Sequence, residues 1–585
     1  AIADIDMGVS VRKQKIIFYP LVACLLLVSQ LVHAILQPII DHHEIFHPVV
    51  GRKGMVASQE VLASQIGLDI LQRGGNAVDA AVAVGFALAV TLPRAGNLGG
   101  GGFMLVHLAE QGKTIALDYR EMAPLKASRD MFLNEKGEVD MHMARNSYRS
   151  AGVPGTVAGL LHALREYGTM KPSEVIKPAL VLAEKGFVLS HTLAEEFKSR
   201  RSQLSSSEAG KKIFFKADGS DYKTGEKFVQ KDLAWSLKQI MRHGEKAFYQ
   251  GAIAKRFVAD FKKHQGVIDF DDLASYEVAL REPVVGEYRG YKVVSMPPPS
   301  SGGVHVLQML NILEAYDLQA LGHNSADYLH LLTESMKYAY ADRSEYLGDP
   351  DFISVPIASL TSKQYAQRLN SNIDVTKARA SDDIKPGKDI LFESHDTTHF
   401  SVADRFGNVV SNTYTLNFSY GSGIVVAGTG ILLNNEMDDF SAKPGVPNGY
   451  GLVGGEANAI TPRKRPLSSM TPTIVLRNDK PYLVMGSPGG SKIINIVLQV
   501  ILNVLDHGMN IAEASSVPRI HHQWYPDVLN VERGISRDTL RLLQQKGHQL
   551  KDSTVLGSTQ SILIDEGVFE GASDPRQPGA LTVAY

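Results

Sequence analysis

Thr397 stands at the sharpest change of composition in the chain, and its position suits nucleophilic chemistry. Residues 371–396 are polar and almost free of apolar clusters, whereas a strand-like alternation begins at Thr397. A threonine hydroxyl is a weak nucleophile, but the α-amine of an N-terminal threonine is a base that can activate it. Such an amine titrates at about 7.7–8.0 and can therefore accept and return a proton near neutral pH. This chemistry requires a cut between Asp396 and Thr397.

A predicted β-hairpin holds Thr397 at its start. Apolar and polar residues alternate from Thr398 to Ala403, and a turn at residues 404–408 leads into a second run over residues 409–416. A further strand pair is expected over residues 473–477 and 482–485, and an apolar strand over residues 580–585. The sequence after Thr397 is therefore rich in predicted strands.

The sequence before Thr397 has mostly helical periodicity. A glycine-rich run over residues 96–102 predicts a tight turn within it. Strands gathered after residue 397, with helices before and between them, favour sheets covered by helices. We expect helices over residues 60–73, 77–89, 304–316 and 326–346, further helices between 155 and 280, and strands over 55–58 and 288–296.

Composition and charge indicate the class of protein and the kind of partner. The chain has 585 residues, of which 44% are hydrophobic and 21% are charged, as is typical of a globular protein. Sixty Lys and Arg residues face 62 Asp and Glu residues, so no net field would attract nucleic acid or an anionic membrane. We therefore expect a small-molecule partner and no nucleic acid.

The N-terminal region resembles a secretory signal. Arg12, Lys13 and Lys15 precede the apolar run 16–32, and Val32-His33-Ala34 offers a cleavage point. We expect a signal peptide over residues 1–34 and a secreted, periplasmic or extracellular protein; the alternative is an uncleaved membrane anchor. The single cysteine, Cys24, lies in this segment. Its removal would exclude disulfides, thiolate metal sites and cysteine nucleophiles.

Other catalytic motifs fail on their context. His43-Glu44-Ile45-Phe46-His47 matches the zinc-protease pattern, but Pro48 disfavours helical geometry at His47. Gly112-Lys113-Thr114 ends like a phosphate-binding loop, but His107 stands where that loop needs glycine. The chain contains no G-x-S-x-G nucleophile elbow. We expect neither a metal nor a cofactor, and the zinc-protease alternative predicts activity that a chelator abolishes.

Two threonines at the start of a strand are by themselves typical of ordinary β-propensity. A set of longer motifs, from about Gly54 to the C-terminus, resembles the γ-glutamyltransferase family of N-terminal nucleophile hydrolases. The matching segments are Gly74-Gly75-Asn76-Ala77-Val78-Asp79-Ala80, Asp118-Tyr119-Arg120-Glu121, Thr397-Thr398-His399-Phe400-Ser401, Thr413-Tyr414-Thr415-Leu416-Asn417, Asn434-Asn435-Glu436-Met437-Asp438-Asp439-Phe440, Arg465-Pro466-Leu467-Ser468-Ser469-Met470 and Gly486-Ser487-Pro488-Gly489-Gly490-Ser491.

The resemblance implies a binding site for a zwitterionic γ-glutamyl head group. It assigns the α-carboxylate to Arg120, whose planar guanidinium can bind it bidentately, and to the hydroxyls of Ser468 and Ser469. It assigns the α-ammonium to acceptors on three residues. Some family members have Gln at one of these positions, so we expect that contact to be charged in this chain and to tighten binding. The three acceptor residues are Asn417, Glu436 and Asp439, and the variable position is Glu436.

The resemblance also implies the catalytic roles around Thr397. Thr415 would hydrogen-bond the Thr397 hydroxyl and orient it. Gly489 and Gly490 would present backbone N–H groups to the oxyanion of the tetrahedral intermediate. Tyr450, in the Pro- and Gly-rich stretch 441–455, would belong to a lid over the pocket.

By this resemblance, the chain has a four-layer αββα fold made of a large chain, residues 35–396, and a small chain, residues 397–585. We expect the two chains to form a heterodimer. The resemblance implies that Thr397 attacks glutathione or another γ-glutamyl compound and passes the acyl group to water or to an amino-acid or dipeptide acceptor. The membrane is a partner only if the N-terminal segment is retained. Two alternatives remain: a glutaryl-type β-lactam acylase, which would not need Asp439, and a non-catalytic secreted binding protein.

Overall fold

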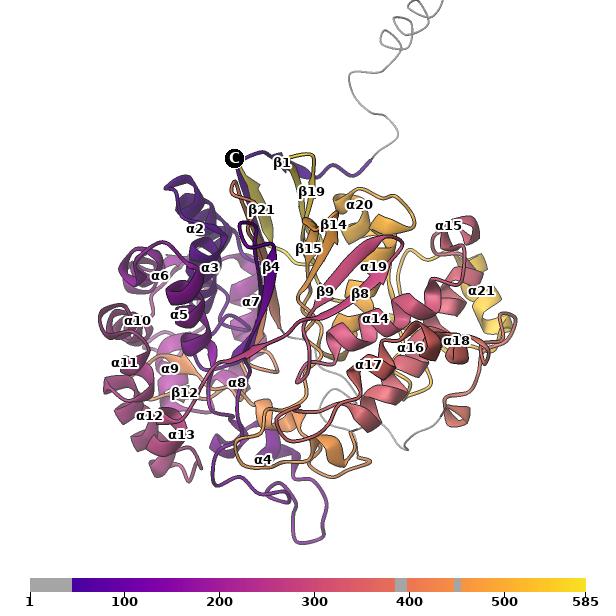
Figure 1. Ribbon diagram of the computed structural model, residues 1–585. Helices are drawn as coiled ribbons and strands as arrows, with labels where there is room; N and C mark the ends of the chain where they lie inside the picture. The colour runs from indigo at the N-terminus through magenta and orange to yellow at the C-terminus, as the bar shows by residue number, and fades with distance from the viewer. Residues whose placement is uncertain (1–44, 385–396, 447–453) are drawn as a thin grey trace, which may run out of the picture. The chain divides into compact units, whose positions relative to one another are not determined.

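The computed structural model describes residues 45–384, 397–446 and 454–585 (Figure 1). Asp396, Tyr450, the predicted signal segment and the first two residues of the zinc-protease-like motif, His43 and Glu44, therefore lie outside the described residues. Within the described ranges, no helix is both long enough and apolar enough to cross a membrane. Residues from Pro48 to Tyr585 form one unit, and the following description concerns this unit.

Two seven-stranded sheets form the centre of this unit. In the first, which contains the strand after Thr397, the order is β21 (Leu581–Ala584), β2 (Gly54–Ser58), β10 (Thr398–Asp404), β11 (Val409–Thr415), β3 (Gly101–Leu108), β4 (Lys113–Tyr119) and β7 (Ala279–Arg281). In the second, the order is β1 (Val49–Gly51), β20 (Val568–Ser573), β19 (Gln560–Asp565), β15 (Lys480–Met485), β14 (Thr473–Arg477), β9 (Tyr291–Ser295) and β8 (Val284–Tyr288).

Helices cover the outer face of each sheet, so the layers run helix, sheet, sheet, helix (Figure 1). The β10 sheet is covered by a group that includes α2 (Val61–Gln72), α3 (Ala77–Thr91), α5 (Thr156–Tyr167), α6 (Pro172–Lys185), α10 (Lys231–His243), α11 (Glu245–Tyr249) and α12 (Ala252–Lys263). The other sheet is covered by a group that includes α14 (Gly302–Leu313), α16 (Ala326–Tyr346), α18 (Lys363–Asn370), α19 (Ile493–Leu505), α20 (Ile511–Ser516) and α21 (Arg537–Gln545). The predicted four-layer αββα fold is confirmed.

Shorter elements lie around these layers. Three small strand groups pair outside the main sheets: β5 (Phe187–Val188) with β6 (Lys227–Phe228), β12 (Val425–Val426) with β13 (Ile431–Leu432), and β16 (Ile520–His521), β17 (Leu529–Glu532) and β18 (Leu550–Ser553). The remaining short α-helices are α4 (Met141–Arg145), α7 (His191–Ser199), α8 (Arg201–Leu204), α9 (Glu208–Phe214), α13 (Phe270–Ala274), α15 (Leu318–Leu321) and α17 (Ile357–Leu360).

The β10 sheet is buried on both faces, and its sequence shows why. Successive side chains of a strand point to opposite faces. On β3, Phe103 and Leu105 belong to the core between the two sheets, whereas Met104 and Val106 belong to the core under the helices. Both sets are apolar, which a sheet covered on each side requires.

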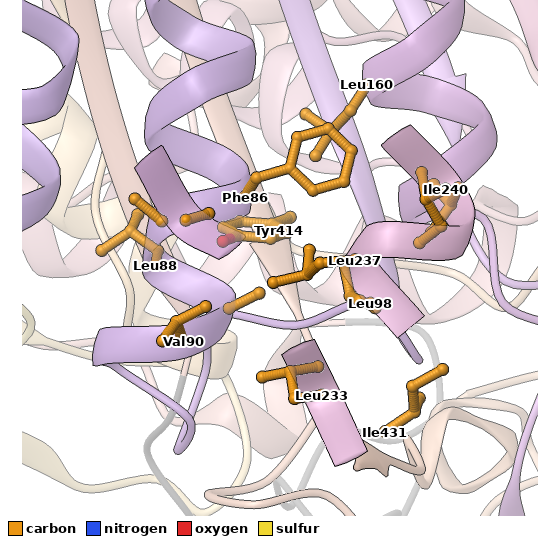
Figure 2. Close-up of a cluster of buried hydrophobic side chains, with 14 of the residues drawn as sticks. Phe86, Leu88, Val90, Leu98, Leu160, Leu233, Leu237, Ile240, Tyr414 and Ile431 are labelled. Carbon is orange, nitrogen blue, oxygen red and sulfur yellow. The ribbon is translucent and has the colours of Figure 1, made fainter. Parts of the chain in front are cut away.

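Helix α3 fixes the hairpin from the outer side. A capping box between Asn76 and Asp79 begins the helix, and all its residues are buried, as expected for a helix that is apolar all round. Tyr414 of β11 donates its hydroxyl to the Gly85 carbonyl of α3 at 2.8 Å. Figure 2 shows Tyr414 in one apolar cluster with Phe86 of α3 and Leu237 of α10. The strand that ends at Thr415 is thereby held against the helix layer.

Each main sheet combines strands from before and after Thr397. Strand β10 pairs antiparallel with β2, where Phe400 faces Ser58, and with β11, where Phe400 faces Asn412. In the second sheet, β14 of the later part pairs with β9 of the earlier part. The two parts of the chain are thus interleaved in both sheets.

Most predicted elements agree with the structure, but the turn predicted over residues 96–102 overlaps the start of β3 at Gly101, and the helix predicted over residues 304–316 ends at Leu313. The predicted helix over residues 326–346 has those bounds, and the hairpin after Thr397 is formed by β10 and β11. The predicted strand over 288–296 is wrong at its start, because residues 284–288 and 291–295 are separate strands. Arg289 and Gly290 adopt positive φ values of 51° and 84° between them. The turn could not be recognised from the sequence, because apolar and aromatic residues on either side of it are typical of a strand.

Candidate active site

Thr397 lies directly before β10 and beside the end of β11. Its side chain is buried, and its hydroxyl donates to the hydroxyl oxygen of Thr415 at 3.4 Å. The same oxygen of Thr415 accepts the backbone N–H of Asn417 at 2.9 Å. Asn417 has a positive φ of 77°, which turns the chain out of the strand at this point. The two strands thus place the predicted nucleophile and its predicted orienting residue side by side.

A small cavity joins Thr397 to most of the predicted substrate-binding residues. The space that water could occupy in it is only about 20 Å³, room for about one water molecule. A glutamyl group could enter only if side chains that now fill the cavity moved apart. The lining residues are Arg120, Arg343, Thr397, Thr415, Asn417, Glu436, Asp439, Ser468, Ser469, Met470, Gly490, Ser491 and Ile493.

Arg120 is the charged centre of this cavity. It follows β4 directly, is fully buried, and donates through Nη2 to Oδ2 of Asp439 at 2.5 Å and through Nη1 to Glu436. Its Nε donates to the Pro466 carbonyl at 3.2 Å. Burial disfavours the charge, but Glu436, Asp439 and Glu121 outweigh it and raise the pKa of Arg120. The guanidinium is therefore charged and held in place before any substrate arrives.

Glu436 and Asp439 begin and end a single 3₁₀ turn, η3 (Glu436–Asp439), so both reach Arg120 from the same side. Burial, the largest effect, raises the pKa of Glu436 well above its usual range, and Glu121 and Asp439 raise it further against the opposing effect of Arg120. Burial therefore works against the negative charge expected on Glu436, because the side chain is almost completely removed from water.

Ser468 and Ser469 also line the cavity, and Arg343 of α16 contacts Ser469. Arg343 donates to Oγ of Ser301 at 2.9 Å and to Oγ of Ser469 at 3.2 Å. Among the described residues it forms no ion pair with a carboxylate, and burial lowers the pKa of Arg343 to about 10. Sequence reasoning missed this second guanidinium. The available signal was an arginine in a helix that is otherwise buried over most of its length.

The two predicted oxyanion-hole glycines are placed differently. Gly490 lines the cavity with Thr397, whereas Gly489 lines a neighbouring cavity with Pro488 and Gly557. Their φ values are 55° and 141°, which glycine adopts without the strain that a side chain would introduce. A 3₁₀ turn, η5 (Gly490–Lys492), starts here and leads into α19. The role of these backbone N–H groups stays a prediction.

One group of side chains outside the cavity has the composition of a metal site. Ligand atoms of His330, Glu334 and His548 lie within 4.8 Å of one another. They already have protein partners: the two histidine rings share a hydrogen bond of 2.8 Å, and Glu334 pairs with Lys337 at 3.1 Å. Lys337 would also oppose a cation beside Glu334. The group joins α16 to the segments around residues 374 and 548.

The sequence is similar to gamma-glutamyltranspeptidases and related proenzymes over most of its length. A family model described as gamma-glutamyltranspeptidase matches residues 63–584. The chain is 53% identical over 543 residues to the glutathione hydrolase proenzyme of Escherichia coli (strain K12), covering 93% of each chain. It is 37% identical over 540 residues to the acylase ACY 1 proenzyme of Pseudomonas sp. (strain SE83), covering 91% of this chain and 94% of that one.

The fold is similar to solved structures of an acylase and of a gamma-glutamyltranspeptidase. The cephalosporin acylase from Bacillus halodurans matches with a TM-score of 0.82 and 28% identity, covering 94% of this chain and 99% of that chain. The gamma-glutamyltranspeptidase of Helicobacter pylori matches with a TM-score of 0.56 and 50% identity, covering 59% of this chain and 97% of that chain. The sequence is more similar to the transpeptidase, although the acylase structure covers more of the chain.

Proposed function

The chain belongs to the γ-glutamyltranspeptidase family of self-processing enzymes, and we propose that it is cut before Thr397 and hydrolyses glutathione and related γ-glutamyl amides with Thr397 as nucleophile. One observation carries this proposal. A single cavity holds the Thr397 hydroxyl together with the cation Arg120 and the carboxyl groups of Glu436 and Asp439. A γ-glutamyl substrate carries its own carboxylate and ammonium at one end and its reactive amide at the other.

The reaction follows from these groups. The free α-amine of Thr397 accepts the proton of its hydroxyl while the oxygen attacks the γ-carbonyl carbon. Backbone N–H groups at Gly489 and Gly490 stabilise the tetrahedral oxyanion. In acyl-transfer enzymes, the loss of one such donor raises the activation free energy by about 3–4 kcal/mol. The C–N bond then breaks, and the amine leaves with the proton that Thr397 had received. Water or an acceptor amine attacks the resulting ester by the reverse of these steps.

Thr415 orients the nucleophile in this scheme. Its hydroxyl oxygen lies 3.4 Å from that of Thr397 and is itself fixed by the Asn417 N–H. A nucleophile held in one rotamer needs less reorganisation to reach the carbonyl carbon. The rigid hairpin therefore supplies positioning, while the terminal amine supplies the base.

The head-group site explains selection of γ-glutamyl substrates. Arg120, Ser468 and Ser469 would bind the α-carboxylate, and Asp439, Glu436 and Asn417 would accept from the α-ammonium. Arg120 now contacts both Glu436 and Asp439. Substrate binding would insert the zwitterion among these groups and open the nearly filled cavity.

The interleaved sheets support a stable two-chain product. After a cut before Thr397, both chains would contribute strands to the same sheet. The large chain would contribute β2, β3 and β4, and the small chain would contribute β10, β11 and β21. We propose that the chain is exported to the periplasm or the cell exterior and that residues 1–34 are its signal peptide. Intact-mass measurement and N-terminal sequencing test the cut and the export together, with Thr397 and Ile35 as the two expected N-termini.

A direct test uses Thr397→Ala and the conservative Thr397→Ser. We expect Thr397→Ala to remain one chain on a denaturing gel and to be inactive, and Thr397→Ser to be cut, with a lower rate of γ-glutamyl anilide hydrolysis. Cleavage and full activity of Thr397→Ala would overturn the assignment. Hydrolysis of glutaryl anilide at a rate equal to that of γ-glutamyl anilide would instead favour a glutaryl acylase.

A further inference from the structure

Glu121 is a buried carboxyl group next to the cavity that holds Thr397 and Arg120. The reaction scheme gives Glu121 no role. It follows Arg120 in the chain, is fully buried, and its Oε2 lies 3.6 Å from Nη1 of Arg120. Glu436 contacts the same nitrogen, so the two carboxyl groups meet at Nη1 of Arg120. The cavity therefore adjoins three carboxyl groups, those of Glu121, Glu436 and Asp439.

Three carboxylate oxygens in this cluster lack hydrogen-bond donors. Among the described residues, neither oxygen of Glu121 nor Oε2 of Glu436 has a hydrogen-bond partner. The backbone encloses Glu121 closely, because a Cβ on Gly101 would lie 2.7 Å from its Oε2 and one on Gly152 would lie 2.8 Å from its Cβ. A buried acceptor without a donor is destabilising, and more so when it is charged. Three such oxygens at one place require a donor.

The charges of the surrounding groups indicate which donor is missing. Arg120 and Arg343 supply two positive charges near the cavity, and three ionised carboxyl groups would leave an excess negative charge among buried side chains. The terminal amine of Thr397 acts in the reaction as a neutral base and adds no charge in that state. The other titratable groups that face Glu121 are neutral phenols on Tyr119, Tyr249 and Tyr276. One proton makes the cluster neutral.

We propose that Glu121 and Glu436 hold one proton between them, carried on Oε2 of Glu436 and donated to Glu121, so that Glu436 meets the substrate as a neutral group. This deepens the proposed function and rests on it for the identity of the head-group site. A single shared proton gives partners to Oε2 of Glu436 and to one oxygen of Glu121. Burial raises the pKa of both carboxyl groups, which agrees with a proton kept at neutral pH.

The shared proton has a consequence for substrate selection. With Glu436 neutral, the two arginines are balanced by the carboxylates of Glu121 and Asp439, so the cavity has no net charge. A zwitterionic γ-glutamyl head group enters without changing that balance. A glutaryl group brings a carboxylate without an ammonium and leaves one uncompensated negative charge. Glu121 thus acts as a positioning residue, because it fixes the charge of Glu436 without touching the substrate.

Infrared difference spectroscopy tests the proton independently of activity. Protein labelled with ¹³C-glutamate should show an isotope-shifted protonated-carboxyl band at pH 7.5, and the band should be absent in Glu436→Gln and in Glu121→Gln. In each variant the new amide N–H replaces the acid proton as the donor. Asp342→Asn, which changes a buried carboxyl on α16 bonded to Gln308 and Tyr365, should keep the band. A wild-type spectrum without the band, or a band that persists in both Gln variants, would overturn the proposal and leave the proposed function standing.

A double-variant cycle gives a second, kinetic readout. In either single variant the shared proton is lost together with one carboxyl group, so the charge of the cavity is preserved. The variant with both substitutions lacks both glutamate carboxyl groups and the shared proton. Only Asp439 then opposes the two arginines, so the cavity has one uncompensated positive charge. We expect its KM for a γ-glutamyl anilide to exceed the product of the two single effects by at least fivefold. Effects that simply multiply would mean that both groups are ionised and would refute the shared proton. Two bands on a denaturing gel verify that each variant has folded and been cut.

Discussion

The hydroxyl oxygens of Thr397 and Thr415 lie 3.4 Å apart, directly before one strand and at the end of its neighbour. Antiparallel pairing of Thr398 with Tyr414 fixes this proximity, because the residues next to a ladder pair are also opposite each other. The sheet, and not a flexible loop, therefore positions the Thr397 hydroxyl beside Thr415. We expect the activity to depend on the register of this hairpin.

Thr415→Val should reduce kcat more than it changes KM. The substitution keeps the shape of the side chain but removes the oxygen that contacts Thr397 and accepts the Asn417 N–H. An unsatisfied buried N–H costs about 1–3 kcal/mol, and misorientation of the nucleophile adds to it, so we expect kcat to fall by about 10- to 100-fold. Steady-state kinetics give the measurement. Thr415→Ser should restore most of the loss, and a Ser variant as slow as the Val variant would point to packing of the methyl group.

Asp439→Asn should weaken discrimination between γ-glutamyl and glutaryl substrates. It removes the anion that faces Arg120 and that we assign to the substrate ammonium. Loss of one partner of a buried charge pair costs about 2–5 kcal/mol, so KM for a γ-glutamyl anilide should rise by about 30-fold or more. The rate with glutaryl anilide should change less.

Asp438→Asn is the matched control for this variant. Asp438 is the preceding residue and is also buried, but its Oδ1 pairs with Nε of Arg145 at 3.1 Å. It does not line the cavity with Thr397. The ratio of γ-glutamyl to glutaryl rates should stay near that of the wild type. An equal loss of discrimination in both variants would mean that the η3 turn is disturbed as a whole.

Arg343→Gln should raise KM without a comparable loss of stability. Arg343 donates to Ser469 and forms no carboxylate pair among the described residues, so its charge is free to attract the substrate carboxylate. Hydrogen bonds to charged groups are worth about 1.5–3 kcal/mol, which corresponds to a rise in KM of about tenfold or more. Removing a buried cation also removes its desolvation cost. Substrate kinetics and thermal unfolding of the same preparation separate the two effects, and a large fall in Tm with unchanged KM would contradict the assignment.

His305→Leu should make stability less dependent on acid pH. Burial lowers the pKa of His305 to about 3, so between about pH 6.5 and pH 3 the unfolded chain binds a proton that the folded protein does not. The free energy of unfolding therefore falls as the pH falls through this range, by up to about 1.4 kcal/mol per pH unit for this group. Between pH 7.5 and pH 4.5, the free energy of unfolding of the variant should fall by on the order of 2 kcal/mol less than that of the wild type. Urea unfolding at the two pH values measures this difference. His142→Leu, at an exposed position on α4, is the control and should keep the wild-type pH dependence.

Most of the fold could be predicted from the sequence because periodicity and burial agree along the main elements. The helix over residues 326–346 and the hairpin after Thr397 follow from local pattern. The pairing of β10 with β2 could not be read in this way, because no local signal joins residues 54–58 to residues 398–404. Strand pairings between distant segments depend on packing of the whole sheet and not on the propensity of either strand.

Within the candidate site, the residues were predicted better than the environment that surrounds them. Motif resemblance identified the residues that the cavity brings together, including Arg120, Glu436 and Asp439. It could not give the direction of the pKa shift of Glu436, because that depends on burial and on the neighbouring charges of Arg120, Glu121 and Asp439. Arg343 was missed for a similar reason: only the fold brings α16 to Ser469. Protonation and long-range contacts follow from three-dimensional environment, which a motif does not contain.

The alternation of strands from both sides of Thr397 determines what the cut can do to the molecule. The surface between the two resulting chains includes the hydrogen-bonded edges of β2 and β10 and the core between the sheets. Neither chain could expose that surface to water and remain folded, so we expect no exchange of chains between molecules and no loss of activity on dilution. Once the cut is made, refolding from the denatured state becomes a reaction between two molecules. The protein has to fold while its chain is still continuous.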